Sequence, residues 1–333
     1  MRFIAGESEA DRRLDRVLRK MLGGASLSLV YRIIRKNIRV NGKGATGELL
    51  LKQGDVVDVL LPDEQLDDLT RKNPAVAPAA RKQFAVVFED KNILVVNKPF
   101  GLLTHGDAIE KKNTLTNQVL AYLSGSGGYD PGETNTFAPA PAGRLDRNTT
   151  GLVLFGKTMQ AARYLAIMLK GGIDRNGFVE KAYLTIVSGK MDAPLTLKAR
   201  MKRDDEKNVT RILPETSEEG YSMVTEARPL AVGNDFTLVE ARLLTGRTHQ
   251  IRVQLAEAGY PIIGDRKYGD RTINIRMSRE YGLEAQLLHS FRLKVTKGEG
   301  NLEYLRGKTF KAKPPAGFTK IAEDLGWNMI PKL

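Results

Sequence analysis

The stretch GRLDRNTTGLVLFGK, residues 143–157, joins a polar loop to an apolar run. The apolar residues 152–156 follow polar ones without interruption, which predicts a buried strand. Asp146 therefore lies at the entrance of a strand, where side chains commonly point into clefts. A simpler interpretation also stays open, in which Asp146 caps a turn and pairs with Arg144 or Arg147.

A second stretch, TGRTHQIRVQLAEAGYPIIGDRKYG at residues 245–269, combines the same residue types. Thr248 can cap a helix that runs to about residue 258. His249 and Arg252 are three residues apart, so they share a face near the helix N-terminus. Apolar neighbours suggest that Arg252 is partly buried, and a buried arginine needs a carboxylate partner. We expect a cluster of Arg144, Asp146 and Arg252, although a basic surface turn is the alternative.

The chain from residue 84 to residue 333 alternates strand-like runs with fewer helical patterns. Strands are predicted at 84–88, 93–97, 152–156, 182–188, 195–200, 221–228 and 236–244, and helices at about 114–124, 158–170, 248–258 and 317–325. Because strands outnumber helices and the connections vary, we expect an α+β domain with a mixed, largely antiparallel sheet and flanking helices.

Residues 1–62 predict a separate small α+β domain. Leu14, Val17, Leu18 and Met21 recur at helical spacing, and Ser26 or Ser28 can cap a second helix. Asn41-Gly42 marks a tight turn before a strand at 57–61. Between Arg12 and Lys43 there are ten Lys or Arg and one acid, Asp15. The residues expected to contact phosphates are Arg13, Arg16, Arg19, Lys20, Arg32, Arg35, Lys36 and Arg39.

Two segments lack periodicity. Residues 63–83 carry prolines, alanines and charges, and predict an exposed linker between the two domains. Residues 125–142 are rich in Gly and Pro and end just before Arg144, so we expect a mobile loop that could act as a lid.

Composition excludes several kinds of chemistry. The 333 residues include no cysteine, which rules out a thiol nucleophile, an iron–sulfur cluster, a cysteine zinc site and disulfides. The three histidines lie far apart, without the short ligand spacings of a structural zinc site, so no metal is expected. No apolar run reaches the roughly 18–20 residues of a membrane helix, and the N-terminus has no signal-like apolar core, so we expect a cytoplasmic protein.

The net charge of +13 favours a polyanionic partner. The plainer alternative is a basic surface that only aids solubility. We take a monomer as the default.

Six short motifs in order resemble the RluA family of pseudouridine synthases. They are VVNKP at 95–99 with Gly101, GRLD at 143–146 with Thr149 and Gly151, KAYL at 181–184, GRTHQIRV at 246–253, Gly264-Asp265 with Tyr268-Gly269, and Leu288-His289. The similarity spans about residues 84–295. Residues 12–61 resemble the alpha-L RNA-binding domain that often precedes this catalytic domain.

The resemblance implies a role for each matching residue. Asp146 matches the nucleophile, and Arg252 matches the basic residue that pairs with it. Tyr183 matches the tyrosine that stacks on the flipped uracil, Arg144 the arginine that enters the RNA stack, and Leu288 a residue of the uracil pocket wall. The implied reaction is an isomerisation that needs no redox cofactor or nucleoside triphosphate. Asp146 could add to ribose, add to the base or remove the proton at carbon 2′, and the sequence does not choose.

Further cues resemble the subgroup that acts on large-subunit ribosomal RNA, so that RNA or a ribosomal subunit precursor is the expected partner. These cues are YRIIRK at 31–36 with Arg39-Val40-Asn41, His105-Gly106, and YGDR at 268–271. The sequence departs from the family at Gly143, Asn148 and Thr150, where His, Asp and Ser are usual. In the middle of the domain Gly220-Tyr221 is the candidate for a usual Gly-Lys pair, and misalignment is the alternative. The alternatives are a noncatalytic RNA-binding or ribosome-assembly factor on the same fold, or a synthase acting on transfer RNA.

Overall fold

The computed structural model describes residues 1–6, 8–23, 25–70, 81–130, 137–170, 178–204 and 209–327. The chain divides into two compact units. One contains residues 1–82, 117–140 and 156–162, and the other contains residues 83–116, 141–155 and 163–333. The domain boundaries expected from the sequence, 1–62 and 84–333, stay a prediction.

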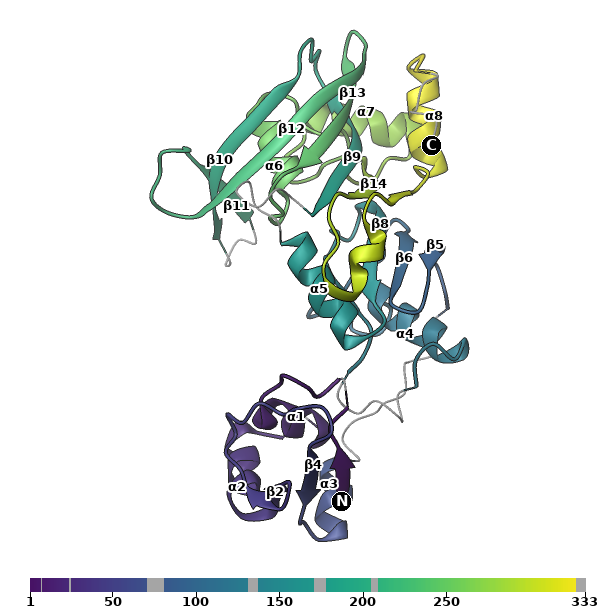
Figure 1. The fold of residues 1–333 in the computed structure, drawn as a ribbon. Coiled ribbons are helices and arrows are strands. Elements are labelled where there is room, and N and C mark those ends of the chain that lie inside the picture. Colours follow the sequence, from purple (N-terminus) through teal and green to yellow (C-terminus); the bar gives the residue numbers. More distant parts are fainter. Residues whose placement is uncertain are drawn as a thin grey trace. The chain divides into compact units, whose positions relative to one another are not determined.

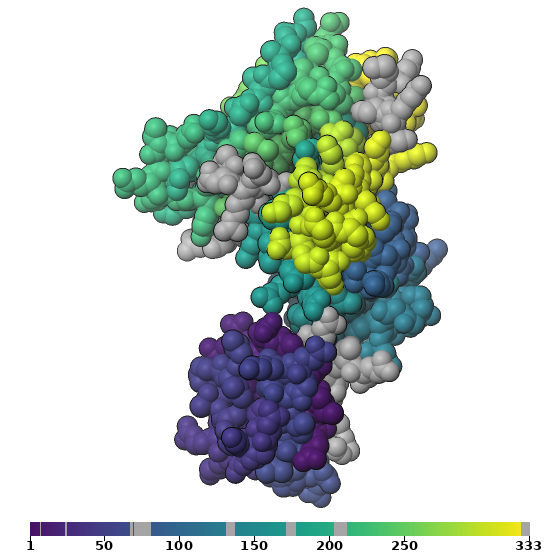
Figure 2. Space-filling view, viewed as in Figure 1, coloured from purple at the N-terminus to yellow at the C-terminus, as the bar shows by residue number. Residues whose placement is uncertain are grey.

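The N-terminal residues form two helices on a small sheet (Figure 1). The elements are β1 (Arg2–Ile4), α1 (Leu14–Met21), α2 (Leu27–Asn37), β2 (Ile38–Val40), β3 (Lys43–Gly44) and β4 (Val56–Val59). The strands pair antiparallel in the order β1-β4-β2-β3. Figure 2 shows this part, in purple, as one closely packed surface.

Local sequence explains these elements. The apolar stripe of α1 is buried at Leu14, Val17 and Leu18, as the spacing predicts. Ser26 caps α2, since its hydroxyl accepts a hydrogen bond from the Leu29 N–H at 3.4 Å. Asn41 and Gly42 both have positive φ, at 52° and 76°, which matches the primed turn expected between β2 and β3.

The predicted linker begins as a helix rather than as irregular chain. Helix α3 covers Asp63–Thr70, and Leu66 and Leu69 pack against the core formed by α1, α2 and the small sheet. The acidic first turn of this helix suits its N-terminus, because the helix dipole is positive there. Residues 71–80 of the predicted linker lie outside the described residues.

The segment 117–140 contains most of helix α4 (Leu115–Gly125). Residues 131–136, in the middle of the predicted lid, lie outside the described residues. The lid therefore stays a prediction.

An 11-stranded mixed sheet dominates the described residues of the second unit (Figure 1). Along the sheet the strands are β11 (Val209–Leu213), β10 (Leu195–Asp204), β12 (Tyr221–Val232), β13 (Phe236–Leu243), β9 (Val179–Ser188), β14 (Leu288–Val295), β8 (Thr150–Gly156), β6 (Ile93–Lys98) and β5 (Ala85–Glu89). Strand β15 (Thr309–Lys311) pairs with β14, and β7 (Ala140–Pro141) pairs with β8. The predicted α+β class and the mixed, largely antiparallel sheet are confirmed.

Helices cover the two faces of the sheet. Alternate residues of β9 point to opposite faces. Tyr183 and Val187 pack with Ile251 and Leu255 of α6 (Gln250–Glu257). Leu184 and Ile186 pack instead with residues of α7 (Arg271–Tyr281) and α8 (Ala316–Asp324). Helix α5 (Met159–Leu169) follows β8, and a 3-10 helix, Gly300–Leu305, follows β14.

Strand β14 lies between β8 and β9, parallel to the first and antiparallel to the second. Ser290 pairs with Gly151 on one side and with Tyr183 on the other. Gly151 has a φ of 109°, and a Cβ at this position would lie 2.2 Å from the Ser290 carbonyl oxygen. Only glycine permits this close approach, which brings the loop before β8 next to Leu288 and Tyr183.

Candidate active site

A cavity of about 520 Å³ opens at the loop that precedes β8. Its walls come from this loop, from β9 and β14, and from the turn that leads into α6; they include Arg144, Asp146, Tyr183, His249, Arg252 and Leu288. The volume falls within the range of about 300–1,000 Å³ that small-molecule sites usually have. Every cavity residue belongs to the second unit.

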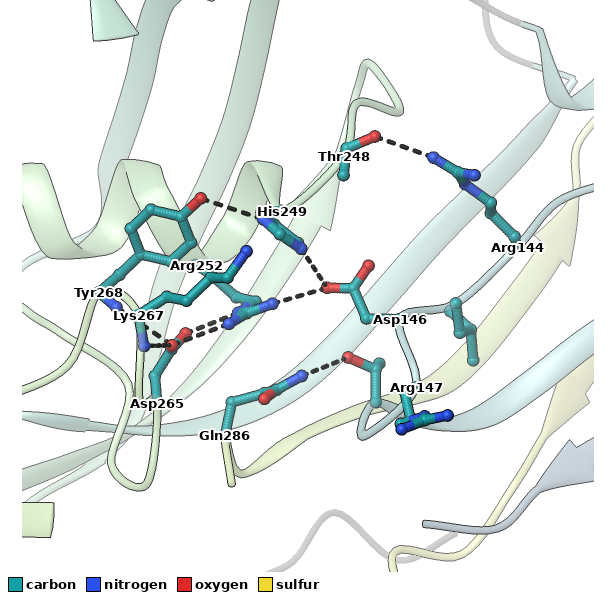
Figure 3. A network of polar contacts seen from close by, with 12 residues as sticks. Arg144, Asp146, Arg147, Thr248, His249, Arg252, Asp265, Lys267, Tyr268 and Gln286 are labelled. Atoms are coloured by element: carbon teal, nitrogen blue, oxygen red, sulfur yellow. Dashed lines mark hydrogen bonds and ion pairs between the residues drawn. The ribbon is translucent and has the colours of Figure 1, made fainter. Parts of the chain in front are cut away.

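Asp146 forms an ion pair with Arg252 at the floor of the cavity (Figure 3). The Arg252 Nη1 donates to Asp146 Oδ2 at 3.0 Å. Asp146 is half-buried, whereas Arg252 is buried. The structure thus brings together the two residues that the sequence paired, from segments more than 100 residues apart.

A second carboxylate, Asp265, completes this floor. Arg252 donates to it from Nε at 2.6 Å and from Nη2 at 2.8 Å, in the bidentate geometry that suits a guanidinium. Asp265 is fully buried and also accepts hydrogen bonds from the backbone N–H groups of Lys267 and Tyr268. Asp265 appeared only inside a family motif, and no local pattern indicated its pairing with Arg252.

Electrostatics keep Asp265 and Arg252 charged. Burial alone would raise the pKa of Asp265, but the hydrogen bonds and charge of Arg252 outweigh burial and hold that pKa below its usual value. Burial would likewise lower the pKa of Arg252, and its two carboxylates raise it instead. The guanidinium is therefore a fixed positive charge beside Asp146.

The loop that carries Asp146 is fastened at several points. Lys98 is fully buried at the end of β6, and its Nζ donates to the carbonyls of Pro99, Leu102 and Arg147 at 3.1, 2.7 and 2.8 Å. The Thr104 hydroxyl donates to the Leu145 carbonyl at 3.0 Å and accepts from the Leu145 N–H at 3.2 Å.

These anchors hold the loop on both sides of Asp146 although Gly143 stands where histidine is usual. Burial lowers the pKa of Lys98 to about 7, and the charge of Asp146 opposes that shift. Neither Lys98 nor Thr104 was assigned a role from the sequence.

His249 approaches the same carboxylate oxygen of Asp146 as Arg252 does (Figure 3). Its Nε2 lies 3.8 Å from Asp146 Oδ2, and its Nδ1 lies 3.0 Å from the Tyr268 hydroxyl. The prediction that Thr248 caps α6 is wrong. The N-cap residue is His249, which has a left-handed φ of 57° and makes no side-chain cap hydrogen bond. The Thr248 hydroxyl accepts a hydrogen bond from Arg144 instead of capping the helix.

Tyr183 and Leu288 form part of the cavity wall and are buried. Burial raises the pKa of Tyr183 to about 12, so its phenol keeps its proton near neutral pH. Lys181 also lines the cavity, and its Nζ donates to the Leu169 carbonyl at 3.0 Å. Because the Tyr183 phenol is neutral, this side chain contributes an uncharged aromatic ring to the cavity wall.

Arg144 is exposed at the cavity rim, and its Nη2 donates to the Thr248 hydroxyl at 3.1 Å. The predicted cluster is therefore only partly formed, since Arg252 reaches Asp146 while Arg144 points to Thr248 (Figure 3). Also near the cavity, the guanidinium of Arg247 lies 5.0 Å from the ring centroid of the exposed Tyr221.

The predicted phosphate-contacting residues lie on α1, α2 and β2 of the other unit. Six of them are exposed: Arg16, Arg19, Lys20, Arg32, Arg35 and Lys36. Arg13 differs, because its guanidinium donates hydrogen bonds to the buried Asp15 and also to Tyr31 and Glu48. Arg39 is half-buried and donates to the Ile38 carbonyl.

The described residues hold no group of three or more His, Asp or Glu that could bind a metal. None of the helices in the described ranges is both long enough and apolar enough to cross a membrane.

Comparison with known proteins places the site in context. Residues 92–257 match the model of a family described as RNA pseudouridylate synthase. The chain is 32% identical over 294 residues to a ribosomal large subunit pseudouridine synthase C of Vibrio cholerae serotype O1, which covers 85% of both chains. It is 33% identical over 295 residues to the protein of that name from Escherichia coli (strain K12), which covers 86% of both.

Solved structures share the fold. Human RNA Pseudouridylate Synthase Domain Containing 4 aligns with a TM-score of 0.57 at 23% identity, covering 74% of this chain and 94% of that one. Human RNA Pseudouridylate Synthase Domain Containing 1 aligns with a TM-score of 0.51 at 20% identity, covering 75% and 97%.

Proposed function

The chain belongs to the RNA pseudouridylate synthase family, of the RluA and RluC type, and we propose that it converts uridines of large-subunit ribosomal RNA to pseudouridine with Asp146 as nucleophile. The protein is an isomerase. The RNA target rests on relatives named for the ribosomal large subunit, which align over nearly their whole length.

The observation that carries the assignment to Asp146 is its place on the floor of the cavity beside a buried arginine. A nucleophilic carboxylate acts as an anion, and the Arg252 guanidinium, whose Nη1 lies 3.0 Å from Asp146 Oδ2, places a positive charge beside it. A protein that only bound RNA would gain nothing from a negative charge in a cleft that receives a polyanion.

The reaction breaks the bond between ribose carbon 1′ and uracil nitrogen 1 and forms a bond from carbon 1′ to uracil carbon 5. Carbon 5 loses a proton and nitrogen 1 gains one, so the reaction is balanced without an oxidant, reductant or phosphate donor. In this proposal Asp146 acts on the nucleotide by adding to ribose, by adding to the base or by removing the proton at carbon 2′.

The target uridine must leave its stack to enter the cavity, at a cost of a few kcal/mol. Arg144 is exposed at the rim and is the side chain we assign to the gap in the RNA. Tyr183 and Leu288 form the wall against which the uracil lies. Stacking of a base on an aromatic ring contributes about 1–3 kcal/mol, enough to offset much of the extrusion cost.

The N-terminal helices supply affinity for the RNA backbone. Helix α2 contains no acidic residue, and the single acid of α1, Asp15, is buried against Arg13. The six exposed basic residues therefore have no exposed acidic residue beside them on these two helices. Binding through phosphates weakens steeply with salt. We further propose that the protein acts as a monomer in the cytoplasm.

The test compares Asp146→Asn with Asp235→Asn, a control on the exposed surface of the same unit. Each variant is returned to cells that lack the gene, and pseudouridines are mapped in total RNA. We expect sites in large-subunit ribosomal RNA that disappear with the gene, return with the control and stay absent with Asp146→Asn.

Other results would redirect the proposal. Lost sites in transfer RNA alone would make it a transfer RNA synthase, and an unchanged map would favour a noncatalytic RNA-binding factor. Full activity of Asp146→Asn would overturn the nucleophile assignment.

A further inference from the structure

The two carboxylate oxygens of Asp146 have different surroundings (Figure 3). Arg252 Nη1 donates to Oδ2 at 3.0 Å, and His249 Nε2 lies 3.8 Å from the same oxygen. Among the described residues, no hydrogen bond or ion pair falls on Oδ1. One oxygen is therefore held by the protein, and the other is available to the substrate.

His249 is held in an unusual backbone conformation. Its φ of 57° is left-handed, and the other described non-glycine residues with positive φ, Asp11 and Asn41, lie in the other unit. Such a conformation is strained for a residue other than glycine and persists where surrounding contacts enforce it. Gln250 provides these contacts, because its side-chain oxygen accepts hydrogen bonds from the Arg247 N–H at 3.1 Å and the Thr245 hydroxyl at 2.8 Å.

The ring of His249 spans two partners. Tyr268 approaches Nδ1 with its hydroxyl at 3.0 Å, and the two rings meet edge to face at 5.6 Å. If Nδ1 carried the proton, the lone pair of Nε2 would face the negative Asp146. If Nε2 carries the proton, Nδ1 accepts from the phenol and Nε2–H points to the carboxylate. Charge thus selects the second tautomer.

The neutral form of His249 fits the charges around it. Burial lowers its pKa, and the positive charges of Arg252 and Lys267 lower it further, while Asp146 and Asp265 act in the opposite direction. A neutral imidazole can donate one hydrogen bond to Asp146 without adding charge to the floor of the cavity.

We propose that His249, locked by Tyr268 with its proton on Nε2, is a positioning residue that holds Asp146 Oδ2 together with Arg252 and so directs Oδ1 at the substrate. This inference rests on the proposed function of Asp146. The gap of 3.8 Å closes to a hydrogen bond with a shift of about 1 Å, and such contacts often tighten only when substrate binds.

Two substitutions of His249 separate this role from a purely structural one. His249→Gln places an amide nitrogen near the site of Nε2, so it can still donate to Asp146. His249→Asn places its amide near the site of Nδ1, where it reaches Tyr268 but not Asp146. Asparagine also tolerates left-handed backbone better than glutamine does, so His249→Asn should fold at least as well.

The proposal predicts that kcat falls about 10–100-fold in His249→Asn and less than tenfold in His249→Gln, with KM little changed in both. If His249 only shaped the turn before α6, asparagine would serve at least as well as glutamine. Equal or higher kcat for His249→Asn would therefore sink the proposal, provided that thermal unfolding shows both variants folded.

Nitrogen-15 NMR of the full-length protein reads the tautomer directly. The chain has only three histidines, His105, His249 and His289, so the signals of His249 are assigned by their loss in His249→Asn. We expect the proton on Nε2 in the wild type and a mixture of tautomers in Tyr268→Phe. A wild-type proton on Nδ1 would refute the proposal. This readout needs no substrate, so it stands apart from any failure of the proposed function.

Discussion

Replacing Asp265 with asparagine tests how much this buried carboxylate contributes to the pair of Asp146 and Arg252. Asp265→Asn keeps the size of the side chain but removes its charge. It also turns an NH₂ group toward the Arg252 guanidinium, which now donates at 2.6 and 2.8 Å. One donor would then face another in a fully buried position.

The expected loss follows from the burial of this pair. Removing one partner of a buried ion pair costs about 3–5 kcal/mol. Because Arg252 keeps its bond to Asp146 at 3.0 Å, we expect the lower part of that range. For a domain of this size, each kcal/mol shifts the unfolding midpoint by about 2–4 °C, so the midpoint should fall by at least about 6 °C.

Thermal unfolding followed by circular dichroism measures this shift, with Asp235→Asn as the matched control. The exposed pair of Asp235 with Arg276, in which the side chains are 65% and 42% exposed, should contribute less than about 1 kcal/mol. Equal midpoints for the two variants would show that Asp265 does not stabilise Arg252 as the geometry implies.

Three more predictions concern other parts of the molecule. In Lys98→Met the carbonyls of Pro99, Leu102 and Arg147 lose their hydrogen-bond donor. The free energy of unfolding, measured by urea titration, should therefore fall by at least about 3 kcal/mol. An unchanged urea midpoint would show that Lys98 does not anchor the Asp146 loop. Burial lowers the pKa of His289 to about 4, whereas the pKa in the unfolded chain is about 6.5, so the contribution of the neutral side chain to stability is fully present above pH 6.5. As the pH falls from 6.5 to 4, the unfolded chain binds a proton that the folded one does not, and the free energy of unfolding falls by about 3 kcal/mol. His289→Gln should lose that much less over the same window, and parallel curves of unfolding free energy against pH for the two proteins would contradict this. Arg19→Gln combined with Arg35→Gln should reduce the slope of log binding constant against log salt by about 0.7–0.9 for each lost phosphate contact, and an identical slope would place the RNA elsewhere.

The local sequence pattern correctly predicted elements that have a clear apolar stripe or a characteristic turn sequence. The apolar spacing of residues 14–21 gave the α1 helix, and Asn41-Gly42 gave its turn, because the spacing and the turn chemistry are both local. Helix α7 was missed because only Met277 of its 11 residues is buried, which leaves almost no apolar stripe. Its local signals lay at its two ends: Asp270 caps it by accepting from the Ile273 N–H, and Gly282 ends it in a left-handed conformation.

The site was predictable as a set of residues but not as a geometry. Partial burial of Arg252 indicated that it needs a carboxylate, but the pattern could not show that Asp265 takes two of its three bonds. Thr248 had the chemistry of a helix cap, yet a contact with Arg144 from more than 100 residues away took its hydroxyl. Such pairings depend on how the sheet folds, which no short window of sequence contains.

The place of β14 between β8 and β9 has a consequence for synthesis on the ribosome. In the described sheet, β14 (Leu288–Val295) is the strand between β8 and β9, and the ribosome makes it more than 100 residues after Asp146. The nascent chain therefore carries Asp146 long before β14 supplies its part of the cavity wall. A premature stop just before residue 288 leaves β8 and β9 without the strand between them, and fragments with such exposed strand edges are prone to aggregate.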